Sequence, residues 1–182
     1  MKGRSAWDTW WLLLMSSPQV ELAKKAIEAF INKGKKISPS SDLPSELKER
    51  AGVFVSIHKN GQLRGCIGTF LPTKANIAEE IISNAIYAST EDPRFPPVMP
   101  KEIPELDVSV DVLTLPEPAN ISELDPKKYG IIVSCGMKRG LLLPDLEGVD
   151  TPERQIDICR QKAGIRENEP VSIEKFCVKR YH

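Results

Sequence analysis

Arg64 and Cys66 stand two positions apart in the segment Leu63–Thr69, and they are the residues whose types and spacing best suit chemistry. If the segment is a β-strand, the two side chains project from the same face with about 6.6 Å between them. A guanidinium at that distance favours the thiolate, which is the nucleophilic form of cysteine. We therefore take Cys66 as the candidate catalytic thiol and Arg64 as its activator and anion binder.

A structural interpretation of Cys66 stays open beside this one. A free cysteine commonly packs as a small hydrophobic side chain without any chemical role. No catalytic triad can be assembled from the sequence, because His58 is several residues further along the same predicted face. The residues alone therefore leave open whether the protein is an enzyme.

Further candidate binding residues surround the cysteine or lie in the proline-rich segment Asp92–Pro97. A glycine within a strand leaves room for a ligand or for another segment of the chain. The prolines exclude a helix and can hold Arg94 rigidly toward a carboxylate or phosphate, although this arginine could equally cap the preceding helix. The candidate binding residues are Gly65, Gly68, Thr69, Phe54, Arg94 and Phe95.

The direction in which Cys66 points depends on the register of a hairpin formed by residues 53–58 and 63–68. A two-residue loop would bring the charged Arg64 into the apolar row, whereas a three-residue loop, 59–61, separates apolar from polar side chains. We expect the three-residue loop, which places Cys66 on the face away from the valines. The predicted pairs are Ile57 with Leu63, Val55 with Gly65, Phe54 with Cys66 and Val53 with Ile67.

The remaining pattern predicts an α+β fold with antiparallel sheets, because strands and helices do not alternate as βαβ units. Helices are indicated where a capping residue and proline precede an apolar stripe and a glycine follows it. Helices are expected at residues 18–33, 75–89 and 152–163, with a short helical turn near Leu47. Strands are expected at residues 106–112, 131–133, 141–143 and, as one continuous closing strand, 173–181.

Composition narrows the range of functions. The 182 residues contain 25 basic and 25 acidic side chains, so the formal net charge is zero and nucleic-acid binding is disfavoured. Its only support is the basic group Lys175, Lys179 and Arg180. The four cysteines form no Cys-x-x-Cys pair and their spacing fits no metal site, so we expect neither metal nor cofactor, and reduced thiols in the cytoplasm.

Residues 1–16 are expected to form an N-terminal extension that precedes the domain. They hold three tryptophans, Trp7, Trp10 and Trp11, beside a short apolar run. That run is far shorter than the roughly 20 residues that span a membrane. We therefore expect the extension to pack on the domain or on a partner, and we expect no membrane association.

Several segments together resemble the AMMECR domain family. The motif Leu63–Thr69, which reads Leu-Arg-Gly-Cys-Ile-Gly-Thr, is the most specific, and the resemblance covers residues 18–182. The other matching segments are Asp92–Pro97, Val108–Leu113, Arg139–Pro144, Asp145–Thr151 and Val178–Tyr181. The resemblance implies one domain over residues 17–182, built as two unequal lobes with the Cys66 motif near their junction.

The match is close to the prokaryotic A component of the AmmeMemoRadiSam system. It implies company with a Memo-like protein and a radical S-adenosylmethionine (SAM) enzyme, while the family has no agreed reaction. We also expect an unknown small molecule as a partner. We expect an enzyme or enzyme subunit that uses Cys66 in a cleft. The alternatives are a non-catalytic interaction module that presents Leu63–Thr69 and, third, a nucleic-acid-binding role.

Overall fold

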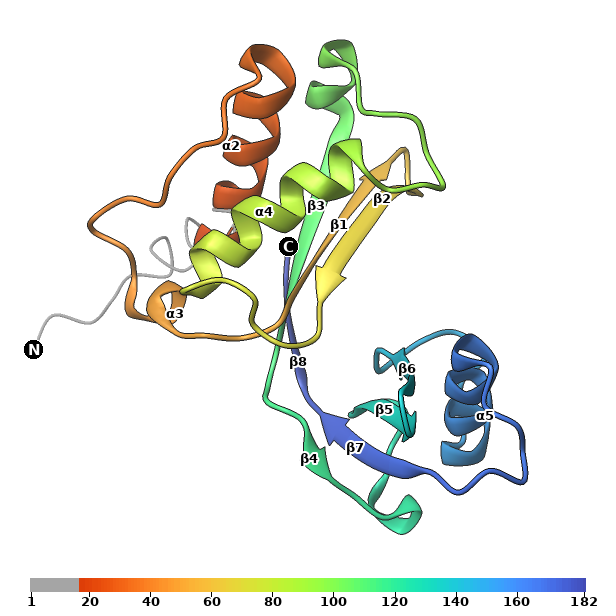
Figure 1. Ribbon diagram of the computed structural model, residues 1–182. Coiled ribbons are helices and arrows are strands. Elements are labelled where there is room, and N and C mark those ends of the chain that lie inside the picture. Colours follow the sequence, from red (N-terminus) through yellow and green to blue (C-terminus); the bar gives the residue numbers. More distant parts are fainter. Residues whose placement is uncertain (1–16) are drawn as a thin grey trace, which may run out of the picture. The chain divides into compact units, whose positions relative to one another are not determined.

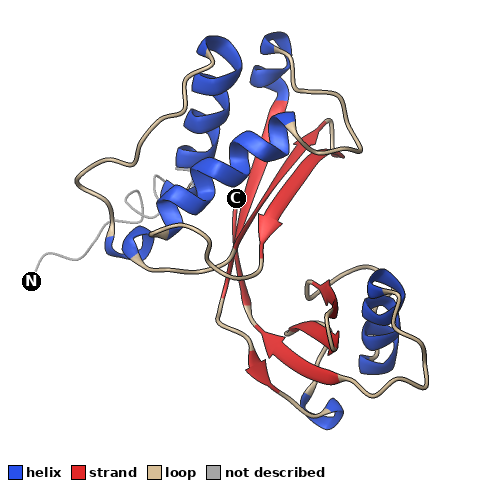
Figure 2. Cartoon of the chain, viewed as in Figure 1, coloured by secondary structure: helices blue, strands red, loops and turns tan. Residues whose placement is uncertain are grey.

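The computed structural model describes residues 17–182, so the expected extension 1–16 lies outside the described residues (Figure 1). The described chain divides into two compact units, residues 17–111 with 180–182, and residues 112–179. Helices and two antiparallel four-stranded sheets confirm the predicted α+β class (Figure 2). Within residues 17–182, no helix is long and apolar enough to cross a membrane.

The first unit is built on a sheet with strand order β2-β1-β3-β8. Helix α4 packs against β1 and β2, and helix α2 packs against α4 (Figure 1). Alternate residues of β1 fill the interface with α4, because Val53, Val55 and Ile57 are fully buried. The bounds are α2 Pro18–Lys33, α3 Ser45–Lys48, β1 Val53–Lys59, β2 Gln62–Thr69, α4 Ile77–Thr90, η1 Pro100–Glu105, β3 Leu106–Leu113 and β8 Val178–Tyr181.

Helix α2 ends where its sequence signals predict. The Ser17 hydroxyl accepts a hydrogen bond from the Val20 amide at 3.4 Å, and Gly34 ends the helix in the left-handed conformation at φ 61°. Helix α4 starts two residues later than predicted, because the Asn76 side chain caps it by accepting from the Glu79 amide at 2.9 Å.

The predicted hairpin loop and its four strand pairs are wrong. Lys59 pairs with Gln62, so the loop is the two-residue turn Asn60-Gly61, and both turn residues have positive φ, at 53° and 75°. Asn-Gly favours this tight turn because both residues tolerate the left-handed region. The register then shifts beyond His58, so that Ile57 pairs with Gly65 and the intervening Arg64 is the extra residue of a β-bulge.

The bulge restores the predicted sidedness of the cysteine. After the shift, Val55 pairs with Ile67 and Ser56 pairs with Cys66. Because one added residue reverses the alternation of a strand, Cys66 lies on the face away from the buried valines, as expected. Its cross-strand neighbour is therefore Ser56 and not the predicted Phe54.

The second unit is built on a sheet with strand order β4-β7-β5-β6, and helix α5 packs against β5 and β6. Its core includes Ile131, Val133, Ile156 and Cys159, and the predicted inward position of Cys159 is confirmed at 0% exposure. The bounds are β4 Glu117–Pro118, η2 Ile121–Glu123, β5 Gly130–Cys135, β6 Lys138–Leu142, α5 Pro152–Ala163 and β7 Ser172–Phe176.

The single closing strand predicted for residues 173–181 is wrong, because it divides into β7 and β8, which belong to different sheets. Cys177 lies between the two strands. Its amide donates to the Thr114 hydroxyl at 2.9 Å, and its carbonyl accepts from the Thr114 amide at 3.0 Å. Cys177, where the chain passes from one sheet to the other, therefore has both its backbone N–H and its C=O hydrogen-bonded.

Each unit seats its helix against a glycine of its hairpin. A Cβ atom at Gly65 of β2 would collide with the carbonyl oxygen of Ala88 in α4. A Cβ atom at Gly140 of β6 would collide likewise with the carbonyl oxygen of Cys159 in α5. The two glycines therefore permit close contact between helix and strand.

Candidate functional site

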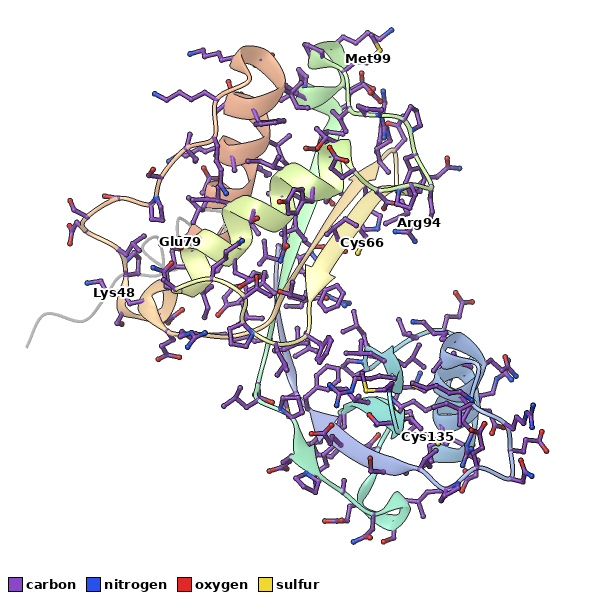
Figure 3. The ribbon with its side chains drawn as sticks, in the orientation of Figure 1. Lys48, Cys66, Glu79, Arg94, Met99 and Cys135 are labelled. Atoms are coloured by element: carbon purple, nitrogen blue, oxygen red, sulfur yellow. The ribbon has the colours of Figure 1, made fainter. Side chains whose placement is uncertain are left out.

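The thiol of Cys66 is half-buried on the face of β2 away from α4 (Figure 3). The Ser56 hydroxyl, across the strand pair, donates a hydrogen bond to its sulfur at 3.3 Å. Figure 3 shows the sulfur on the same side of the unit as the labelled Arg94. The cysteine is therefore a partly accessible thiol with a hydroxyl and a guanidinium nearby.

The backbone of Cys66 is bonded on the outer edge of the sheet by two side chains of the turn after α4. Its amide donates to Oδ2 of Asp92 at 2.9 Å, and its carbonyl accepts from Nη2 of Arg94 at 3.3 Å. Because β2 is an edge strand, these side chains occupy the hydrogen-bonding positions of a missing neighbour strand. Both the amide and the carbonyl of Cys66 are thereby hydrogen-bonded to side chains.

Asp92 and Arg94 form a tight ion pair. Oδ1 of the aspartate accepts from Nε at 2.9 Å and from the Arg94 amide at 3.1 Å, and Oδ2 accepts from Nη2 at 2.7 Å. The Asp92 side chain is only 2% exposed, whereas that of Arg94 is 55% exposed. The aspartate therefore anchors a guanidinium that still reaches solvent.

The electrostatics of this pair also involve the cysteine. Hydrogen bonds from Arg94 lower the pKa of Asp92 far below its usual range, with help from the Cys66 amide, although burial acts in the opposite direction. Hydrogen bonds to Asp92 raise the pKa of Arg94, burial opposes them, and the charge and hydrogen bonding of the Cys66 side chain add a smaller rise. Arg94 therefore stays cationic next to Cys66.

Arg64, the predicted activator, is engaged elsewhere. Its Nε and Nη2 donate to the two carboxylate oxygens of Glu102 at 3.2 and 3.0 Å. Its Nη1 and Nη2 donate to the carbonyls of Pro96 and Pro97 at 2.8 and 3.3 Å. Arg64 holds the pKa of Glu102 at about 2, helped by the Met99 amide. The bulge residue thus ties the proline segment and η1 to the hairpin.

The other predicted binding residues have packing roles. A Cβ atom at Gly68 would collide with the Phe54 ring, and the space at Gly65 is taken by α4. The Thr69 hydroxyl donates to Glu80 at 2.7 Å. Phe95 is the exception, because its ring lies 5.5 Å from the guanidinium carbon of Arg94, a cation–π distance.

The Thr69 contact belongs to a buried hydrogen-bond network around Glu80 that the sequence did not predict. The Glu80 carboxylate, on α4, also accepts from the amide and hydroxyl of Thr73 and from the Lys74 amide, each at 2.8 Å. Burial acts to raise the pKa of Glu80, but the hydrogen bonds from these residues outweigh it and lower the pKa. The hydrogen-bond network around Glu80 fixes the loop between β2 and α4.

Two residues that bond Cys66 were also missed. Asp92 carries a usable signal, because an aspartate before a proline commonly bonds the amide two residues on, as it does with Arg94. Ser56 gave no signal, because its position opposite Cys66 depends on the bulge. Arg94, predicted to face a carboxylate or phosphate, faces the carboxylate of Asp92 and not the end of the helix.

The other cysteines and the basic residues near the C-terminus form no comparable arrangement within residues 17–182. Cys135 and Cys177 are half-buried, whereas burial raises the pKa of the Cys159 thiol to about 12. Lys175 lies 3.7 and 3.6 Å from Glu117 and Glu123. Arg180 pairs with Asp111 at 2.7 Å. Across residues 17–182, no three His, Cys, Asp or Glu side chains are grouped to hold a metal ion.

Comparison with known proteins gives close relatives along most of the chain. A protein of Thermotoga maritima is 57% identical over 168 residues, which cover 90% of this chain and 97% of that protein. A protein of Clostridium acetobutylicum is 51% identical over 166 residues, but the match spans only 36% of its length. The crystal structure of an uncharacterised protein from Pyrococcus horikoshii matches with a TM-score of 0.80 and 35% identity, over 89% of this chain and 88% of that one.

A family model extends the same relationship to nearly all of the described residues. The AMMECR1 model matches residues 20–182, which include the Cys66 motif, the Asp92–Pro97 segment and both units. The expected resemblance is thereby confirmed, and the chain belongs to the AMMECR1 family.

Proposed function

We propose that the protein is an enzyme or enzyme subunit in which the Cys66 thiolate attacks an electrophilic carbon of a small-molecule substrate. A sulfur–carbon bond forms, the leaving group departs with its bonding electrons, and the thiol proton passes to water. Arg94, in place of the predicted Arg64, stabilises the negative sulfur. The thiol must be reduced, so a reducing compartment such as the cytoplasm is part of the proposal.

The supporting observation is the joint anchoring of Cys66 and Arg94 by Asp92. One buried carboxylate accepts from the Cys66 amide at 2.9 Å and from the Arg94 guanidinium at 2.7 Å. Such an arrangement holds a positive charge at Cys66 without requiring rearrangement during reaction, which is the usual basis of electrostatic stabilisation.

Alkylation of individual cysteines tests the proposal. The intact protein is treated with iodoacetamide at pH 7, and the rate at each of its four cysteines is read by peptide mass spectrometry, with the urea-unfolded chain as reference. Cys66 should react about fivefold faster in the folded protein, the factor that corresponds to roughly 1 kcal/mol, the order of one ion contact in water. Buried Cys159 should be protected and serves as the internal control. A Cys66 rate no higher than in the unfolded chain contradicts the proposal.

We also propose that the reaction partners are a Memo-like protein and a radical SAM enzyme. This proposal rests on the family resemblance of the Cys66 motif. Purified partners from the same organism should co-elute with this chain on a sizing column. Independent elution of all three proteins at micromolar concentration would remove the support for this assembly.

A non-catalytic interaction module is the second candidate. Its support is that α2 and α4 both lie on one side of the β1–β2 pair, so that the described residues of the first unit supply no helix to the face that carries Phe54, Ser56 and Cys66 (Figures 1 and 2). In this case Cys66→Ser should keep partner binding intact, whereas Phe54→Asp should abolish it. Alkylation of Cys66 by iodoacetamide that is faster than in the unfolded chain would instead favour the enzyme.

A further inference from the structure

Within residues 17–182, two nitrogens of the Arg94 guanidinium are bonded to the protein and the third, Nη1, is not. Asp92 occupies the side formed by Nε and Nη2, with distances of 2.9 and 2.7 Å. Nη2 also donates to the Cys66 carbonyl at 3.3 Å, and the side chain is 55% exposed. Nη1 is therefore the nitrogen that a ligand from solvent can bind.

A charged N–H donor such as Nη1 suits a carboxylate or a phosphate. An oxygen of such a group can accept a charge-assisted hydrogen bond from it. The Phe95 ring lies 5.5 Å from the guanidinium carbon, and Asp92 fixes the rotation of the guanidinium, so Nη1 is held in place before a ligand arrives. Less conformational freedom is then lost on binding.

Nη1 belongs to the guanidinium that contacts the residue of the proposed nucleophile. Nη2 of the same group donates to the Cys66 carbonyl at 3.3 Å. An anion bound at Nη1 is therefore held by the same side chain that bonds Cys66.

We propose that the substrate of Cys66 carries a carboxylate or phosphate close to its electrophilic centre, and that Nη1 of Arg94 binds that anion. This inference rests on the proposed function and specifies its substrate class. It assigns two tasks to one guanidinium, because the same group that stabilises the thiolate selects the molecule that the thiolate attacks.

Iodoacetate and iodoacetamide form a matched pair of probes, since they differ in little more than one negative charge. Both transfer a two-carbon group to sulfur with loss of iodide. The ratio of the iodoacetate rate to the iodoacetamide rate is measured at each cysteine of the intact protein and of the unfolded chain. At Cys66 this ratio should be about threefold to tenfold higher in the folded protein, as expected for one ion contact, and should fall toward the unfolded value in 0.5 M salt.

Variants identify the responsible group. Arg94→Gln should lower the Cys66 ratio to its unfolded value, and Arg94→Lys, which keeps a charge but loses the planar guanidinium that Asp92 holds, should give an intermediate ratio. Lys101→Gln removes an exposed charge of the same unit and should leave the ratio unchanged. Thermal unfolding of each variant verifies that it is folded. Inorganic phosphate should slow iodoacetate more than iodoacetamide.

The outcomes separate this inference from the proposed function. A fast reaction of Cys66 with iodoacetamide and a ratio equal to that of the unfolded chain would overturn the anion site and leave the nucleophile standing. A raised ratio with no acceleration by iodoacetamide would support the anion site and contradict the nucleophile. A raised ratio that persists in Arg94→Gln would show that another group attracts the anion, and would overturn the assignment to Arg94.

Discussion

Asp92→Asn should destabilise the first unit while keeping the shape of the side chain. The carboxylate accepts four hydrogen bonds, and an asparagine can keep only the two made by one oxygen. The amide nitrogen would then face two donors, the Cys66 amide and Nη2 of Arg94. Each hydrogen bond to a charged group is worth about 1.5–3 kcal/mol. Because Arg94 is 55% exposed and water can replace part of the loss, we expect about 2–3 kcal/mol in total.

The assay is urea or thermal unfolding monitored by a signal from the first unit. The expected loss corresponds to a fall in Tm of about 5–10 °C for a chain of this length. Asp107→Asn is the matched control, because Asp107 is an exposed aspartate on β3 of the same unit, and it should change stability by less than about 0.5 kcal/mol.

The pH dependence gives a second, independent check on the same substitution. A carboxylate whose pKa is lowered by folding contributes stability that is fully present above its unfolded pKa, near 3.9, and is lost as pH falls toward its folded pKa. The stability difference between the wild-type protein and Asp92→Asn should therefore be largest at pH 5–7 and shrink below pH 4. A stability difference under about 0.5 kcal/mol at pH 7, or one that is independent of pH, would refute the joint anchoring of Cys66 and Arg94 by Asp92.

Two further substitutions test the packing around the site. Glu80→Gln should lower the free energy of unfolding in urea by about 2–4 kcal/mol at pH 7. The loss should decrease below pH 4, because folding lowers the pKa of Glu80. An unchanged unfolding midpoint would contradict the buried hydrogen-bond network around Glu80. Gly65→Ala should destabilise by more than about 3 kcal/mol, since its Cβ would meet the Ala88 carbonyl, whereas Gly61→Ala should cost only the roughly 1–2 kcal/mol of a positive φ. Equal losses in the two glycine variants would show that α4 is not seated on β2 as described.

Local sequence signals predicted the elements well because their causes are local. The caps of α2 and α5 and the alternation of β1 depend on residues within one turn or one strand. The side of the sheet on which Cys66 lies was also predicted, although by an incorrect register. The bulge at Arg64 and the assumed longer loop both add one residue, and the alternation of the strand responds only to that count.

The site itself could be predicted only in part, because it depends on contacts across the chain. The distance from Asp92 to Cys66 is 26 residues in sequence and 2.9 Å in space, and no spacing rule connects them. Arg64 seemed the natural partner of Cys66 because it is two residues away, but Glu102, which is 38 residues from it, takes its guanidinium. The split of the closing strand at Cys177 escaped prediction for the same reason, since it needs Thr114.

The most direct test of the account compares the iodoacetamide rate of Cys66 in the wild-type protein, in Arg94→Gln and in Arg64→Gln, all shown to be folded at the assay temperature. If Arg94 stabilises the thiolate, the rate at pH 7 should drop about fivefold in Arg94→Gln and stay within twofold of wild type in Arg64→Gln. The opposite ranking, or equal rates in all three proteins, would contradict the assignment of Arg94 to the sulfur.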